Sequence, residues 1–280
     1  MADLESKTNS REYLTVLPKY RAVSWPLLCW RMQEKARRMW LKLRPHDDYE
    51  WSRYHIGYKA EFDWFKRYFT MNLGNVDFRL IEGRLYLLGD CKPVHPAHRC
   101  VWEAIYNLPN ISSVAEIGTG AGYHLLSLSA LLGQAVRLSG YDVSEGQLRF
   151  FRSLWPDCTE RIKTCVLDLT LGPIPEADRP DIVFASTVLM HIQRPVEYHA
   201  ALRNFLISAN GFAVLMENWS RHDYFNDLAA MTRADGGFEG CQTYFYDSGA
   251  NIAIVISLKG VQLDYPYQLL THPAMLEKYY

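Results

Sequence analysis

The sequence lacks an apolar run long enough to span a bilayer, and we expect neither a transmembrane helix nor a signal peptide. It also lacks an excess of charge of one sign: the net charge is −1, whereas nucleic-acid-binding domains are usually basic. We therefore expect no nucleic-acid partner. The six cysteines are scattered without the spacing of a disulfide framework, so reduced thiols and a cytoplasmic location are expected.

The composition that remains is that of an ordinary globular protein. Of the 280 residues, 49% are hydrophobic and 22% are charged, as in a typical folded domain. This length suffices for one large domain or for a core domain with an appendage. Composition alone leaves the function open.

The most informative segment is Val114-Ala-Glu-Ile-Gly-Thr-Gly-Ala-Gly122. It predicts a short buried strand that runs into a glycine loop, and the apolar stretch from His124 to Leu132 predicts a helix after it. Glycines at 118, 120 and 122 adopt positive φ freely and leave the backbone bare. A ligand can then touch the backbone and the unpaired N–H groups at the start of the helix.

The residues around these glycines favour a cationic ligand. A dinucleotide pyrophosphate wants G-x-G-x-x-G, but here the spacing is G-x-G-x-G, and Glu116 stands two positions before Gly118. A carboxylate at that place attracts a positive charge. The segment resembles the first motif, E/D-x-G-x-G-x-G, of class I S-adenosylmethionine (SAM)-dependent methyltransferases, and SAM carries an ammonium and a sulfonium. A tight structural turn, or an NAD-binding fold with altered glycines, is the alternative interpretation.

The segments that follow keep the order that this resemblance requires. Leu138–Asp142 predicts a second strand ending in an acid that can bind both ribose hydroxyls. Residues 161–168 predict a third strand; the resemblance places Asp168 and Leu169 beside the adenine. Residues 180–186 and 210–219 predict a fourth and a fifth strand. The resemblance thus gives these candidate cofactor-binding residues: Glu116, Gly118, Gly120, Gly122, Asp142, Val143, Asp168, Leu169 and Ser186.

The expected fold is α/β: a doubly wound, seven-stranded sheet of the methyltransferase type that closes with an antiparallel hairpin. Residues 242–246 and 251–257 are β-rich runs joined by a turn with glycine, which predicts that hairpin. We divide the chain into three parts. They are an N-terminal helical or lid extension with a β-hairpin over 1–110, a SAM-binding domain over 111–258 and a tail over 259–280.

His191 is the candidate catalytic residue. It follows the fourth strand, whose end borders the methyl group in class I enzymes, and some sugar O-methyltransferases of this family carry a histidine in a similar segment. Histidine suits proton transfer because its pKa lies near neutrality. Glu217 and His222, at or after the end of the fifth strand, are candidates for the substrate site. Each of the three side chains has an ordinary structural role as its alternative.

The first 110 residues give less specific signals. Residues 26–43 predict an amphipathic helix with one basic face, which suits either packing on the protein or peripheral contact with an anionic membrane. Residues 49–71 predict an aromatic helix in which Tyr54 and Tyr58, one turn apart, could face the substrate or the core. Residues 78–88 predict a hairpin, and residues 98–107 a helix.

No metal is expected. Cys91, His95, His98 and Cys100 lie close in sequence, but their spacing matches no standard zinc site, and two prolines interrupt them.

The function expected from these observations is SAM-dependent methylation of a small molecule or glycan, at a hydroxyl group. The alternatives are a SAM-binding regulatory module without catalysis, or N-methylation of a small amine, RNA or protein. The Asn-Pro-Pro-Tyr segment of related amino-methylating enzymes is replaced here by Ala185-Ser-Thr-Val188, while basic residues at 19–44 could contact RNA phosphates. The oligomeric state is not predicted.

Overall fold

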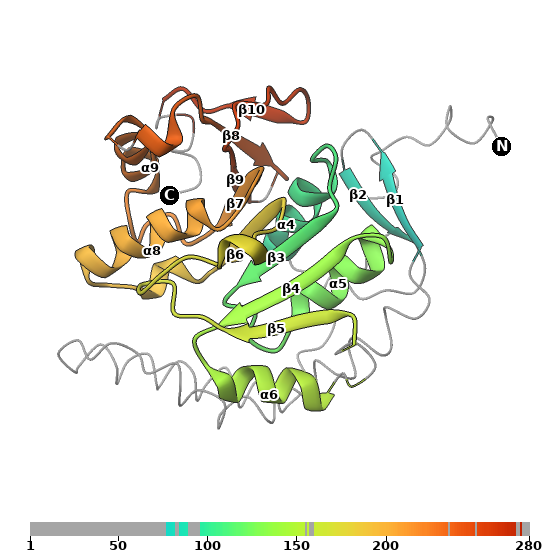
Figure 1. Cartoon of the computed structure of the whole chain (residues 1–280). Coiled ribbons are helices and arrows are strands. Elements are labelled where there is room, and N and C mark those ends of the chain that lie inside the picture. The colour runs from blue at the N-terminus through green and yellow to red at the C-terminus, as the bar shows by residue number, and fades with distance from the viewer. Residues whose placement is uncertain are drawn as a thin grey trace, which may run out of the picture.

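The computed structural model describes residues 77–81, 84–88, 96–154, 156, 160–234, 236–249, 251–272 and 275. Its centre is an eight-stranded sheet in the order β10-β8-β9-β7-β6-β3-β4-β5 (Figure 1). The strands of this sheet are β3 (Ser113–Ile117), β4 (Arg137–Asp142), β5 (Ile162–Val166), β6 (Ile182–Ser186), β7 (Phe212–Met216), β8 (Gln242–Asp247), β9 (Ile252–Ser257) and β10 (Tyr267–Leu269). Neighbours from β7 to β5 pair in parallel, whereas β9 pairs antiparallel with both β7 and β8. The predicted α/β fold is confirmed.

Helices cover both faces of the sheet. Those described are α4 (Pro96–Tyr106), α5 (Tyr123–Leu132), α6 (Glu145–Leu154), α8 (Pro195–Ile207) and α9 (Tyr224–Ala234), with short 3-10 turns η2 (Glu176–Asp178), η3 (Leu189–His191) and η4 (Gly236–Phe238). One apolar core joins α4, α5 and α6 to the sheet, and a second joins α8 and α9 to its other face. Residues of a strand point alternately to the two faces of the sheet. Every residue of β3, β7 and β9 is buried, so both faces of the sheet must be covered, each by its own core.

The hairpin predicted over 78–88 is present as β1 (Asp77–Ile81) paired antiparallel with β2 (Arg84–Leu88). The predicted C-terminal hairpin is likewise present as β8 and β9.

The eighth strand is the difference from the expected seven. It lies in the segment predicted as a tail, where β10 pairs antiparallel with β8. The hydroxyl of the buried Tyr267 donates to the carbonyl of Ala104 on α4 at 2.5 Å. Three residues are too few to show a strand periodicity, so the sequence pattern could not reveal this contact.

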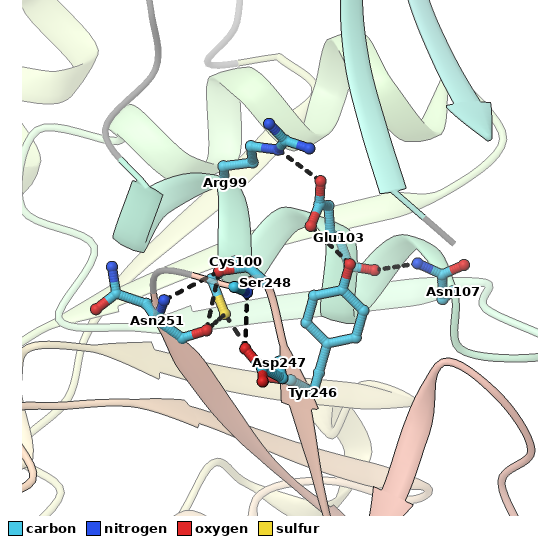
Figure 2. Close-up of polar contacts among 9 residues, drawn as sticks. Arg99, Cys100, Glu103, Asn107, Tyr246, Asp247, Ser248 and Asn251 are labelled. Carbon is cyan, nitrogen blue, oxygen red and sulfur yellow. Dashed lines mark hydrogen bonds and ion pairs between the residues drawn. The ribbon is translucent and has the colours of Figure 1, made fainter. Parts of the chain in front are cut away.

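A buried polar network ties α4 to the C-terminal hairpin (Figure 2). The Glu103 carboxylate is buried; it accepts from Arg99 Nε at 2.6 Å and from the hydroxyl of Tyr246 at 2.6 Å. Next to it, Cys100 Sγ donates to the carbonyl of Asn251 at 3.5 Å, and burial raises the pKa of this thiol to about 12. The network orients α4 on the sheet, because a buried carboxylate needs these partners.

Candidate active site at the carboxyl ends of the strands

The glycine loop follows β3 at the carboxyl edge of the sheet. Gly118, Gly120 and Gly122 all have positive φ, at 70°, 50° and 79°. A Cβ on Gly118 would lie 2.4 Å from Val188 Cγ2, and one on Gly122 would lie 2.0 Å from the Phe151 ring. At Gly120 the nearest atom would be Gln147 Oε1, at 3.7 Å. Two glycines are therefore required for packing, and the middle one leaves its backbone accessible.

The loop is tied to the end of β4. The N–H groups of Gly118 and Thr119 donate to the Tyr141 carbonyl at 2.7 and 3.0 Å. Asp142 Oδ2 accepts from the Gly120 N–H and Oδ1 from the Ser144 N–H, both at 2.8 Å. Each carboxylate oxygen keeps a second lone pair, so Asp142 can still accept from two ribose hydroxyls. Burial raises the pKa of Asp142, and the two N–H groups oppose that shift.

Glu116 lies beneath the loop rather than on its surface. Its side chain is buried, and Thr119 Oγ1 donates to Glu116 Oε2 at 2.8 Å. Burial raises the pKa of Glu116 well above its usual range, and the neighbouring Asp142 carboxylate adds to the shift. The sequence analysis expects a cationic ligand at this loop. Such a cation would favour the ionised form of Glu116.

The remaining cofactor candidates come from neighbouring strand ends. Val143 exposes 46% of its surface beside Asp142, which leaves an apolar patch of the kind that an adenine ring covers. Asp168 Oδ1 accepts from the N–H and the hydroxyl of Thr170, at 2.9 and 2.6 Å. Leu169 is buried, and Ser186 is half-buried at the end of β6. Because β5, β4, β3 and β6 pair in parallel, their carboxyl ends lie on the same side of the sheet.

Glu217 organises the loop after β6. Its Oε1 accepts from the N–H groups of Val188 and Leu189 at 3.0 Å each, and its Oε2 accepts from that of Met190 at 3.2 Å. Burial raises the pKa of Glu217 to about 7, although these three N–H groups oppose the shift. The sequence predicted Glu217 as a substrate-site residue, whereas in the structure its carboxylate holds the backbone of η3.

His191 ends η3 and is half-buried. Burial, together with the nearby positive charge of Arg221, lowers the pKa of His191 to about 4. The imidazole is therefore neutral at pH 7 and can accept a proton, but the lowered pKa makes it a weaker base than the near-neutral histidine that the sequence predicted. His222 is instead packed flat against Tyr198 of α8, with ring centroids 3.8 Å apart and planes 9° apart, and burial lowers its pKa.

Two residues with structural signs of a role were not among the predicted ones. Thr187, after β6, has a φ of 58° despite its branched Cβ. Gln147 on α6 is buried, and its Oε1 has no hydrogen-bond partner among the described residues. Gln147 belongs to no motif, and Thr187 lies in Ala185-Ser-Thr-Val188, which differs from the amino-methylating motif, so no sequence signal marks either residue.

Several predictions lie outside the described residues: Tyr54 and Tyr58, the helix over 26–43 with its membrane contact, and Cys91 with His95. Across the described part of the chain, no group of three or more His, Cys, Asp or Glu side chains could hold a metal ion. No helix in that part is long and apolar enough to cross a membrane.

Comparison with known proteins identifies the domain. Residues 114–208 match the family described as "Methyltransferase domain", and this range includes the glycine loop, Asp142 and His191. Over these residues the chain is similar to a methyltransferase domain, and the sheet around them has the α/β fold expected for one. SAM is its cofactor, in agreement with the prediction from the glycine spacing and from Glu116.

The curated relatives belong to RNA modification. A protein of Aliivibrio salmonicida named "tRNA U34 carboxymethyltransferase" is 32% identical over 133 residues, which are 44% of this chain and 40% of that protein. A protein of Vibrio vulnificus with the same name is 26% identical over 180 residues, 60% of this chain and 54% of that protein. The chain thus spans about half the length, or less, of these relatives. A solved structure described as "PigF with SAH" superposes with a TM-score of 0.46 at 14% identity, over 58% of this chain and 54% of that one.

These relatives correct two sequence predictions. The expected small-molecule or glycan acceptor is contradicted, because the matching curated proteins are named for a tRNA nucleoside. The expectation of no nucleic-acid partner is wrong for the same reason. Net charge misled here because it averages over the whole chain, whereas RNA contact depends on the local charge around one site. O-methylation likewise finds no support.

Proposed function

We propose that this protein is a SAM-dependent transferase that modifies a nucleoside of tRNA. The observation that carries the proposal is the 30–32% identity to several proteins named tRNA U34 carboxymethyltransferase. The geometry at the carboxyl ends of the strands supports the part of the proposal that concerns SAM binding. The accessible backbone at Gly120 and the free lone pairs of Asp142 fit a ligand with a ribose diol.

When bound, SAM supplies a carbon activated by positive sulfur. The chain's own residues have two tasks, to position the acceptor and to remove its proton. Glu217 fixes the loop of residues 188–190, and this loop leads directly to His191. In the proposal, the neutral His191 accepts the proton of the acceptor's nucleophilic atom, while Arg221 beside it contributes a positive charge that suits an RNA phosphate.

The test is transfer to a defined tRNA. The full chain is incubated with methyl-labelled SAM and a tRNA transcript carrying U34, and the digested nucleosides are analysed by mass spectrometry. We expect label in the nucleoside of position 34 and none in a matched transcript with C34. Because the relatives are named for carboxymethyl transfer, a donor with a carboxymethyl group on its sulfonium is tested in parallel. Failure of both donors on U34 tRNA, by protein that binds S-adenosylhomocysteine (SAH), would contradict the tRNA acceptor.

The role of His191 is tested in the same assay. Loss of a general base costs about 10²- to 10⁴-fold in rate, so His191→Ala should lower kcat by that order while SAH affinity stays close to the wild-type value. His191→Gln keeps a polar side chain of similar reach and serves as the control for shape. Near-normal turnover in both variants would remove His191 from the proton-transfer step.

A further inference from the structure

Gln147 carries a buried polar atom for which the fold has no evident use. The residue lies on α6, is 4% exposed, and its Oε1 has no hydrogen-bond donor among the described residues. An unsatisfied buried acceptor destabilises a protein because the desolvation of the atom is not compensated. Such groups in native structures call for an explanation, of which a missing ligand is one.

The position of this oxygen points to the cofactor. Gln147 follows Ser144, whose Oγ accepts from the Gln147 N–H at 3.3 Å, so the start of α6 is fixed directly after β4. Gln147 Oε1 is the one atom found within 4 Å of a Cβ built on Gly120. The N–H of the same glycine donates to Asp142 Oδ2. The amide oxygen and the Asp142 carboxylate therefore flank one accessible residue of the loop.

We infer that Gln147 Oε1 accepts a hydrogen bond from a ribose hydroxyl of the bound cofactor, and so acts as a second ribose ligand beside Asp142. The inference rests on the SAM site, and it is independent of the tRNA acceptor. The ribose is favoured over other donors of the cofactor because it is the group assigned to Asp142, which accepts from the N–H of the same Gly120. The neutral amide oxygen of Gln147 and the charged carboxylate of Asp142 would then both accept hydrogen bonds from the ribose diol.

The experiment replaces the amide by an unbranched apolar side chain of similar length, Gln147→Met, and measures binding by isothermal titration. The ligands are SAH, its 2′-deoxy and 3′-deoxy analogues, and 5′-methylthioadenosine, which keeps the ribose but lacks the amino-acid end. We expect the variant to bind SAH and 5′-methylthioadenosine about tenfold more weakly, the size of one hydrogen bond. Affinity for one of the two deoxy analogues should be the same in wild type and variant.

Thermal unfolding of the free protein separates this role from a structural one. Removal of an unsatisfied oxygen should leave the melting temperature of Gln147→Met unchanged or raised, whereas a residue that serves only packing would lower it. Three results would overturn the inference: equal weakening for every ligand, weakening for SAH with none for 5′-methylthioadenosine, or no weakening at all. Wild-type protein that does not bind SAH would overturn the cofactor site itself.

Discussion

Thr187 occupies a left-handed backbone conformation at the point where β6 leaves the sheet. Its N–H donates to the Met216 carbonyl at 2.8 Å and its hydroxyl to the Ser186 carbonyl at 2.6 Å, so the conformation is held from both sides. A non-glycine residue pays roughly 1–2 kcal/mol there, and a β-branched one is rarely found. Strain of this kind collects at functional sites, where surrounding contacts maintain it.

Substitution at Thr187 should separate this strain from the side-chain contact. Thr187→Gly should be more stable than Thr187→Ala by about 1 kcal/mol, because both lack the hydroxyl and only glycine relieves the positive φ. The free energy of unfolding in urea measures the difference. Equal stability of the two variants would show that the backbone at 187 relaxes when the hydroxyl is removed. An Ala variant that is the more stable would contradict the strain altogether.

At the scale of elements, the carboxylate of Glu217, in the segment after β7, anchors η3. The sequence marked Glu217 as a substrate-site candidate because it lies at the end of the fifth strand. Its role in holding the η3 backbone could not be predicted from that position. Its partners are backbone N–H groups of residues 188–190. A contact between a side chain and a distant backbone leaves no pattern of residue types. Strands β6, β7 and β9, in contrast, were predictable because each buries a continuous apolar run.

The anchor should make stability depend on pH. Burial raises the pKa of Glu217 from 4.5 to about 7, so between these values the unfolded chain is ionised while the folded protein still binds the proton. Stability from this group is complete below pH 4.5 and is lost as the pH rises to about 7. Relative to Glu217→Gln, the wild type should therefore lose stability between pH 5 and pH 7.

The measurement is urea unfolding of both proteins at several pH values across that interval. The variant is the internal reference, since other buried carboxyl groups, such as Glu116, titrate equally in both. Parallel curves of stability against pH for the two proteins would show that Glu217 is ionised throughout. A wild type that gains stability relative to the variant as the pH rises would mean that the three N–H groups outweigh burial.

At the scale of the whole molecule, the chemistry and the support of the fold lie on different parts of the sheet. The glycine loop and Asp142 follow β3 and β4, whereas β10 forms the far edge, beyond β8, β9 and β7. The sequence marks the first part with a motif, because a loop that binds a cofactor requires glycines and acids at fixed places. It missed the second, because β10 is held by burial of Tyr267 against a helix far away in the sequence. No motif encodes an acceptor, and the small-molecule or glycan acceptor expected from the sequence is contradicted by the names of the relatives.

This separation predicts that the far edge controls stability without affecting the cofactor site. Tyr267→Ala removes a buried ring from the core that contains α4 and should cost about 3 kcal/mol or more of unfolding free energy. Tyr267→Phe removes only the hydrogen bond to the Ala104 carbonyl and should cost about 1 kcal/mol.

Below their melting temperatures, both variants should bind SAH as the wild type does, because the strands that carry the loop are untouched. Weaker binding in proportion to lost stability would instead mean that α4 couples the far edge to the glycine loop, through its contacts with α5. Measuring SAH affinity and unfolding free energy on the same three proteins decides between these outcomes.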